Sequence, residues 1–292
     1  IGVTIYDQVN SEPTLDHVHE SLALYQSSKS QAVIGCGGGS PIDVAKAVSA
    51  LAANAGRLQD YTGIDKFPNN GPHIVAIPTT AGTGSEATST TIVTDVERNV
   101  KMLIISPWLM PTIALVDPQL TLGMPQHITA ATGLDALTHA IEAYVSRRAQ
   151  PMSDIFALSA VRLIAENLPV AWHEPQNLQA RSQTLLGALQ AGIAFSNASV
   201  ALVHGMSRPI GALFNVAHGV SNAALLGVVT RFSLSGAYER YADIARCLGV
   251  ADQDGVEATA LAGAQRIQEL ITTLKIPSLS QLGVTREKLE PV

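Results

Sequence analysis

The sequence predicts an α/β domain followed by an all-helical domain. Two short apolar runs, at 32–36 and 74–78, each lead into a loop rich in glycine or threonine. Such runs are typical of buried parallel strands in an α/β layer. From about Pro125 onward the chain is rich in alanine and leucine, and its apolar residues recur at spacings of three and four. That period indicates helices.

The elements follow from this pattern in order. Ala32–Cys36 predicts the first strand, 41–54 has helical periodicity, and Ile74–Pro78 predicts the next strand. Three further β-rich runs would extend or edge the sheet, at 91–94, 102–105 and 114–116. In the helical part, breaks are expected at five prolines: Pro151, Pro169, Pro175, Pro209 and Pro277.

After Asp117-Pro118 the strand-like runs give way to a helical pattern, so the domain boundary is placed near 118–124. The expected domains are therefore 1–120 and 121–292. Hydrophobic residues make up 47% of the chain and charged residues only 14%. This balance favours a large buried interior over disorder.

Charge and polarity argue against two classes of partner. The net charge is −6 and basic residues form no cluster, so no footprint for nucleic acid is present. The stretches between Arg181 and Arg208, and between Arg208 and Arg231, lack Asp, Glu and Lys and are long enough to span a bilayer. Both contain amide and imidazole side chains that are costly in lipid. We expect buried helices there and no membrane partner.

The cysteine content points to a compartment. Cys36 and Cys247 are far apart and have no metal-ligand spacing. Two thiols in a chain of this size fit a reducing environment better than a disulfide framework. The first residues also lack the basic segment of a signal peptide. A cytoplasmic location is expected.

Three glycines, Gly37, Gly38 and Gly39, follow the first strand and precede a helix. Glycine lets backbone N–H groups turn toward a ligand at close range, and the helix directs its unpaired N–H groups and positive dipole end to the same point. Ser40 is expected to cap the helix and Asp43 to complete a capping box. A cap needs one glycine at most, so three favour a phosphate site over a capped helix alone. The run is not a G-x-G-x-x-G fingerprint.

A second loop, Pro78–Glu86, follows the second strand and contains glycines and hydroxyl side chains. The carboxyl ends of strands are where open α/β sheets bind ligands. The same composition would suit a solvated loop equally well. Its pairing with the glycine turn favours contacts to a nucleotide.

Asp135 and His139 are four residues apart in a helical stretch, so they share one face. A buried Asp–His hydrogen bond would explain this pair as well as a metal site. His204 and His218, however, lie in the charge-free region, where an imidazole must find a partner or a metal. One carboxylate and three imidazoles form a set for a divalent ion such as Fe, Zn, Ni or Co, which acts as a Lewis acid on an alcohol or carbonyl oxygen.

Taken in order, these motifs resemble the iron-containing (group III) alcohol dehydrogenase family. The resemblance extends from Tyr6-Asp7 to at least Asn222. It is carried by Gly37–Ser40 with Asp43 and Lys46, Pro78–Glu86, Gly133–Glu142, His204-Gly205-Met206 and His218-Gly219.

The resemblance implies a dehydroquinate synthase-like fold. Its Rossmann-like α/β domain would bind NAD or NADP, and its all-α domain would bind Fe²⁺, or Zn²⁺ or another divalent metal, with the active site in the cleft between them. The implied metal ligands are Asp135, His139, His204 and His218. The implied cofactor residues are Gly37, Gly38, Gly39, Ser40, Asp43, Thr79, Thr80, Ser85 and Lys101.

The sequence departs from the family pattern at Arg208, where many members carry a further histidine near the nicotinamide. Arginine stays protonated and is a poor base. Arg208 would instead bind an anionic group of the substrate, or pair with a nearby acid or a cofactor phosphate. The family's opening strand and helix, which help to choose between NAD and NADP, and its last helices are expected to lie outside this chain.

The implied activity is hydride transfer between a small alcohol or aldehyde and NAD(P), in a homodimer or larger homo-oligomer. Three relatives of the same superfamily remain alternatives: a glycerol dehydrogenase, a maleylacetate reductase and a dehydroquinate-synthase-like enzyme. A protein that binds a nucleotide and a metal without catalysis is the alternative from another class.

Overall fold

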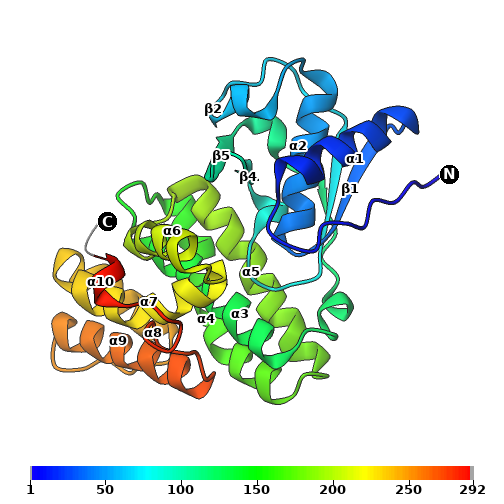
Figure 1. Cartoon of the computed structure of the whole chain (residues 1–292). Coiled ribbons are helices and arrows are strands. Elements are labelled where there is room, and N and C mark those ends of the chain that lie inside the picture. The colour runs from blue at the N-terminus through cyan, green and yellow to red at the C-terminus, as the bar shows by residue number, and fades with distance from the viewer. Residues whose placement is uncertain (1, 290–292) are drawn as a thin grey trace. The chain divides into compact units, whose positions relative to one another are not determined.

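The computed structural model describes residues 2–289. The chain divides into two compact units. Unit 1 runs to Thr80 and resumes over Ser85–Leu120, whereas unit 2 comprises Ala81–Gly84 and the chain from Thr121 on. The division thus lies between Leu120 and Thr121, except for four loop residues that belong to the second unit. Unit 1 is drawn in blue to cyan-green and unit 2 in green to red (Figure 1).

The main sheet of unit 1 is parallel, with strand order β1-β3-β6. β1 (Ala32–Gly37) pairs with β3 (His73–Pro78), and β6 (Ile113–Ala114) pairs with the other side of β3. Helix α2 (Gly39–Ala53) follows β1 in the chain. Because Gly37 is in register with Pro78, the glycine turn and the threonine-rich loop start side by side. The two strands and the helix are confirmed.

Two of the further β-rich runs form a sheet of their own. β4 (Thr90–Asp95) and β5 (Val100–Ile105) are antiparallel, and the short β2 (Gly63–Ile64) pairs with β5. A short turn at 96–99 joins β4 to β5, and adjacent strands joined this way pair with each other. Only the run at 114–116 contributes to the main sheet, as β6.

The core of unit 1 lies between α2, helix α1 (Leu15–Ser27) and the second sheet. Val44 and Val48 of α2 pack in one buried cluster with Val93, Met102 and Ile104 of the hairpin. This burial holds the start of α2, and with it the glycine turn, in a defined place. Short 3₁₀ helices of the chain are Leu58–Tyr61, Ser85–Ala87, Pro107–Leu109, Pro118–Thr121 and Leu234–Gly236.

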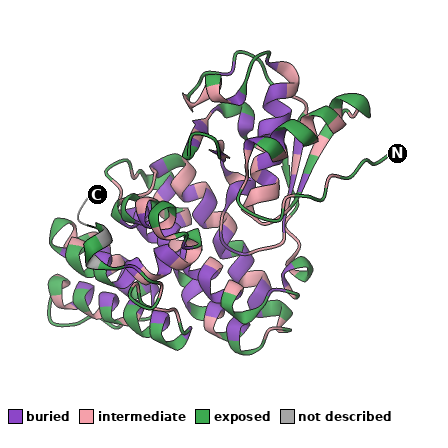
Figure 2. Cartoon of the chain, viewed as in Figure 1, coloured by how far each residue is buried: buried purple, intermediate pink, exposed green. Residues whose placement is uncertain are grey.

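Unit 2 is helical throughout its described residues, apart from loops. Its helices are α3 (Gln126–Val145), α4 (Pro151–His173), α5 (Leu178–Ala198), α6 (Leu202–Phe214), α7 (His218–Ser233), α8 (Tyr238–Cys247), α9 (Val256–Thr273) and α10 (Arg286–Leu289). α3 is buried along most of its length, so it forms the centre of the unit. In Figure 2, buried residues lie where these helices face one another.

Two of the predicted breaks are wrong. Pro169 lies inside α4 and Pro209 inside α6. A proline removes one backbone hydrogen bond, and in α4 the buried Leu168 and Trp172 on either side of it hold the helix against its neighbours. Pro151, in contrast, starts α4 at the position where its missing N–H costs nothing.

The apolar helices also meet simple criteria for membrane spans. α4 is long and apolar enough to cross a bilayer, and 44% of its most apolar window is buried inside the protein. α5 and α6 meet the criteria only as a pair, which is bent by 101°. Core helices of globular proteins satisfy the same test. The bend shows that the first charge-free stretch is two helices and not one.

Candidate functional site

α3 provides the first two members of the site. Asp135 and His139 are one turn apart and both side chains are buried. Close packing around this segment depends on Gly133, where an added Cβ would lie 2.3 Å from the Leu168 side chain of α4. A small residue there lets α4 approach, which buries the acid and the imidazole in the middle of unit 2.

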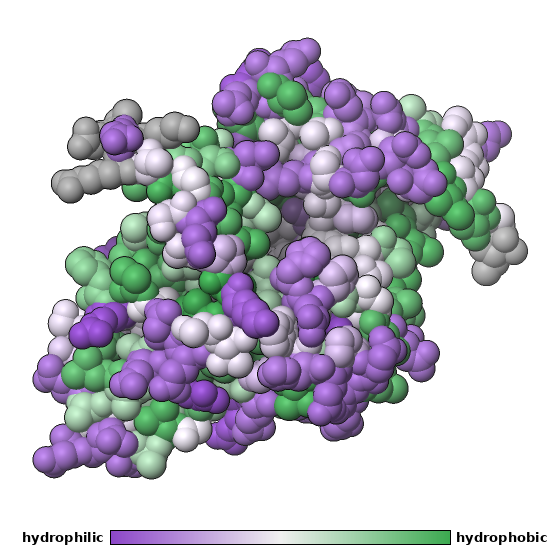
Figure 3. Space-filling model, turned by 60° about the horizontal axis from the view of Figure 1, so that its bottom comes forward, coloured by the Kyte–Doolittle hydropathy of each residue, from purple (hydrophilic) through white to green (hydrophobic). Residues whose placement is uncertain are grey.

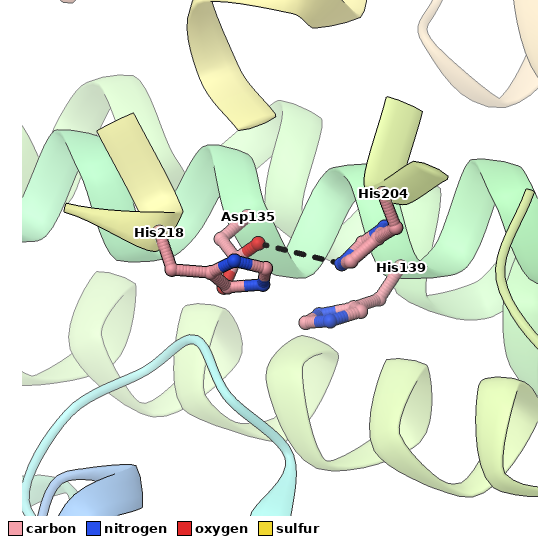
Figure 4. Close-up of side chains that lie close together, drawn as sticks. All are labelled: Asp135, His139, His204 and His218. Carbon is pink, nitrogen blue, oxygen red and sulfur yellow. Dashed lines mark ion pairs between the residues drawn. The ribbon is translucent and has the colours of Figure 1, made fainter. Parts of the chain in front are cut away.

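The other two members come from the starts of two later helices. His204 lies in the first turn of α6, and His218 is the first residue of α7. One ligand atom from each of Asp135, His139, His204 and His218 lies within 4.8 Å of the others. Figure 4 shows these side chains converging, with Nε2 of His204 3.9 Å from Oδ1 of Asp135. His218 alone is exposed to solvent.

Electrostatics prepare these groups for a cation. Burial lowers the pKa of His139 to about 3, although the Asp135 carboxylate and a hydrogen bond to the Gly82 backbone oppose it. Burial also acts to raise the pKa of Asp135, but the three imidazoles and the Asn222 amide outweigh it and hold that pKa below its usual value. A neutral imidazole and an ionised carboxylate are the forms that bind metals.

The polar atoms of the set test whether a metal fits. Nδ1 of His139 and Oδ1 of Asn222 are buried and lack a hydrogen-bond partner among the described residues, and such orphans are uncommon. Nδ2 of Asn222 lies 2.6 Å from Oδ1 of Asp135, and 3.0 and 3.1 Å from Nε2 of His204 and His218. The lone pairs of Asp135, His204 and His218 therefore converge on the position of Nδ2 of Asn222. The donor set fits a divalent ion.

Asn222 was missed by the sequence analysis. It lies four residues after His218 on α7, hence on the same face of that helix. This spacing, the same as that between Asp135 and His139, is the signal in the sequence that would have pointed to it.

The four loop residues Ala81–Gly84 pack within unit 2. An added Cβ at Gly82 would lie 2.6 Å from Thr132 of α3, and one at Gly84, whose φ is +62°, would lie 2.6 Å from Gly192 of α5. The ring of His139 stacks on Phe195 of α5 with centroids 4.3 Å apart. These loop glycines thus allow close packing around the helices that carry His139 and Phe195, and the contact of the loop with a nucleotide stays a prediction.

The glycine turn of unit 1 lies at the carboxyl ends of β1 and β3. Gly37 has a φ of +151°, and an added Cβ there would lie 2.6 Å from the ring of Pro41. At Gly38 an added Cβ would lie 3.6 Å from the Thr80 side chain, an ordinary contact. The N–H of Thr79 donates to the Gly37 carbonyl at 2.8 Å. The structure therefore brings these four predicted cofactor residues together.

The predicted cap of this helix is wrong. α2 begins at Gly39, and its N-cap is Gly38, without a side-chain cap bond. Ser40 thus lies inside the first turn, and Asp43 lies too far along to complete a capping box. The glycines permit the earlier start because the chain can bend sharply before Gly39.

Asp43 instead connects parts of unit 1. The Ser85 hydroxyl donates to its carboxylate at 2.6 Å and the N–H of Ile92 donates at 2.9 Å. Burial raises the pKa of Asp43, opposed by Lys46 nearby. Lys46 itself is fully buried and donates to Thr88 and to the Thr90 carbonyl at 2.8–2.9 Å. Asp43 and Ser85 therefore act in the framework of the turn.

The two remaining predicted residues lie on the surface. Nζ of Lys101 pairs with Glu12 at 2.6 Å, and its contact with a nucleotide stays a prediction. Arg208 is exposed and forms no ion pair within residues 2–289. It lies four residues after His204 on α6, so it extends from the same face of that helix.

Comparison with known proteins gives consistent matches along the chain. A family model described as "Iron-containing alcohol dehydrogenase" matches residues 1–118, and one described as "Fe-containing alcohol dehydrogenase family, C-terminal" matches residues 129–292. The NAD-dependent methanol dehydrogenase of Bacillus methanolicus is 40% identical over 294 residues, which are 99% of this chain and 77% of that protein.

Solved structures agree with these matches. A crystal structure of 1,3-propanediol oxidoreductase has a TM-score of 0.95 at 40% identity, covering 97% of this chain and 74% of the other. Sulfoacetaldehyde reductase from Bifidobacterium kashiwanohense in complex with NAD⁺ has a TM-score of 0.87 at 30% identity, covering 99% and 76%. The predicted succession of a Rossmann-like α/β part and a helical part is confirmed by these structural neighbours.

Proposed function

Because the chain belongs to the iron-containing alcohol dehydrogenase family, we propose that Asp135, His139, His204 and His218 hold the catalytic metal. The chain is an oxidoreductase that transfers a hydride between an alcohol or aldehyde and a nicotinamide cofactor. The observation that carries the proposed site is the convergence of four ligand atoms within 4.8 Å.

The residues around the ion would prepare it for this chemistry. A divalent ion in this set supplies Lewis acidity toward the substrate oxygen. Asp135 offsets part of the cationic charge, and the buried His139 is held neutral and stacked on Phe195, so its direction is set. His218 is the exposed member, so the ion would be open to solvent, and to a substrate, on the side of His218.

For the cofactor, we propose that its pyrophosphate binds at Gly37, Gly38, Gly39 and Ser40, with Thr79 and Thr80 beside it. The unpaired N–H groups of the first turn of α2 and its positive dipole end favour an anion. The absence of a side-chain cap leaves those donors available to a ligand. The Ser40 hydroxyl adds one more donor in that turn.

The substrate class depends on Arg208. Its exposed guanidinium, one turn beyond His204, suits the carboxylate or sulfonate of an anionic aldehyde. A relative named sulfoacetaldehyde reductase acts on such a compound, whereas those named for methanol and 1,3-propanediol act on neutral ones. A contact between Arg208 and a cofactor phosphate is the other role. We propose a small alcohol or aldehyde as the substrate, with Arg208 choosing among them.

The setting of the enzyme is also proposed. Its two cysteines are free thiols, which supports a cytoplasmic location. A homodimer or larger homo-oligomer follows from the resemblance to the family.

Metal analysis and turnover test the proposal together. Purified protein is analysed for transition metals, and oxidation of NADH and NADPH is followed with short neutral and anionic aldehydes, with and without a chelator. We expect a bound divalent metal and turnover that the chelator abolishes. Asp135→Asn should lose both while still binding NADH. Turnover that persists without metal would contradict the site, and tight NADH binding without turnover on any aldehyde would support the non-catalytic alternative.

A further inference from the structure

Glu142 lies beside the proposed metal ligands without being one of them. It is 3% exposed and lies on α3, seven residues after Asp135 and three after His139. At 3.6 residues per turn these three side chains form one stripe along the helix. A second carboxylate is therefore buried within reach of the ligand set.

One oxygen of this carboxylate contacts a ligand imidazole. Oε2 of Glu142 lies 2.6 Å from Nδ1 of His204. Both oxygens of this carboxylate accept hydrogen bonds from backbone N–H groups, and when Oε2 also accepts from the ring, Nδ1 carries the proton. The lone pair of His204 is then on Nε2, the atom that faces Oδ1 of Asp135 at 3.9 Å. The contact selects the tautomer that binds a metal.

The same carboxylate also caps the helix that carries His204. The backbone N–H groups of Ala201, Val203 and His204 lie 2.9, 2.5 and 3.4 Å from its oxygens. α6 has no side-chain cap of its own, because its N-cap residue is Ala201. These first-turn donors would otherwise lack partners, and a negative charge at a helix N-terminus is favourable.

Resting on the metal site proposed above, we propose that Glu142 is a positioning residue of the metal centre, which fixes both the start of α6 and the ring of His204. Glu142 contacts both the backbone and the ring of His204. The cap sets where the backbone of His204 lies, and the Nδ1 contact sets how its ring is turned. Glu142 thus joins α3, which carries two ligands, to the helix that carries the third.

Glu142→Gln tests this role, because an amide keeps the size of the side chain but loses the charge and one acceptor. Metal affinity is measured by competition with a chelator, using Zn²⁺ and Co²⁺. We expect binding to weaken about 10- to 100-fold. The visible spectrum of the Co²⁺-loaded protein, which reports the ligand geometry, should also change.

Two further variants separate positioning from stability. Asp154→Asn removes the partner of Arg240 at 2.6 Å, a contact between α4 and α8 that involves none of the ligands; it should lower the melting temperature without changing metal affinity or the Co²⁺ spectrum. Ala201→Asp, added to Glu142→Gln, supplies a local cap. The double variant should regain stability and still bind metal weakly.

Each remaining outcome has a defined meaning. If the unmodified protein binds no metal, the proposed function fails first. If it binds metal and Glu142→Gln binds equally well, the positioning role is wrong. The role is also rejected if Asp154→Asn weakens metal binding as much, or if the local cap alone restores full affinity. Should Glu142→Gln fail to fold even with that cap, Glu142 serves folding and the inference is rejected.

Discussion

Nδ2 of Asn222 lies 2.6 Å from Oδ1 of Asp135, beside three of the four proposed ligands. The same nitrogen lies 3.0 and 3.1 Å from Nε2 of His204 and His218. Those lone pairs are the ones that a metal ion would take. Nδ2 carries two hydrogens, so while it donates one to Asp135 it can serve one imidazole at a time, and an ion would compete with it for that lone pair.

Asn222→Ala should accordingly destabilise the metal-free protein more than the metal-bound one. A lost hydrogen bond to a buried charged group costs about 1.5–3 kcal/mol, whereas in the bound form the ion satisfies the imidazoles. We expect a lower melting temperature without metal and a larger rise on adding it. Asn197→Ala removes an amide bonded only within α5 and serves as the control. Equal losses in both forms would contradict the competition.

The glycine turn allows a matched pair of variants. Gly37→Ala places a Cβ 2.6 Å from Pro41 at a φ of +151°, so unfolding should become easier by about 1–3 kcal/mol. Gly38→Ala meets only Thr80 at 3.6 Å and should leave stability nearly unchanged. If the cofactor approaches this backbone, Gly38→Ala weakens NADH binding on the order of tenfold. Fluorescence titration with NADH measures this, and unchanged affinity would exclude a close approach.

Arg208→Ala distinguishes the two roles of that side chain. If the guanidinium binds an anionic substrate, kcat/KM for an anionic aldehyde should fall by about 10- to 100-fold, while a neutral aldehyde of the same length is unaffected. Arg208→Lys keeps the positive charge but lacks the paired N–H donors of a guanidinium. Its kcat/KM for the anionic aldehyde should lie between those of the unmodified protein and Arg208→Ala. Weaker NADPH or NADH binding with every aldehyde would instead indicate a cofactor phosphate. An unchanged preference would exclude substrate anchoring.

Lys46 provides a pH dependence of stability. Burial lowers its pKa from 10.5 to about 8, against the attraction of Asp43 and Glu86. Between these two pKa values the unfolded chain holds the proton that the native protein has released. Stability from this group therefore rises as pH increases from about 8 to 10.5, by roughly 3 kcal/mol in total.

Lys46→Met removes the titrating amine and keeps an unbranched side chain in the same buried place. Urea denaturation at several alkaline pH values gives the difference in unfolding free energy between the two proteins. That difference should grow in favour of the lysine as pH rises. A constant difference would mean that Lys46 keeps its proton when buried.

The four proposed ligands show how much a local pattern in the sequence can predict. Asp135 and His139 were predicted as neighbours because a spacing of four places side chains on one helix face in any helix. His204 and His218 entered the prediction through their charge-free surroundings and the family motifs. Their proximity depends on the turn at 215–217 between α6 and α7, where Asn215 adopts a left-handed conformation. Spacing along the chain does not encode such a turn.

The loop 78–86 shows the opposite case. A glycine in this loop can allow the close approach of a ligand or of a packed helix, because both need a position without a Cβ. The sequence alone does not distinguish the two. Gly82 and Gly84 turned out to touch α3 and α5, helices that begin more than forty residues later in the chain. Asp43 likewise read as a capping acid, and its hydroxyl and amide partners at 85 and 92 became visible only in the folded chain.

By itself, the sequence determined the α/β-then-helical order, the strand and helix cores and the identity of four candidate ligands, because periodicity and donor chemistry are properties of nearby residues. Only the tertiary structure decided that Asn222 lies among those ligands, that Glu142 caps α6 and holds His204, and that a four-residue loop belongs to the helical unit. These relationships join residues that are distant in sequence. Burial brings them together, and burial depends on how whole helices pack.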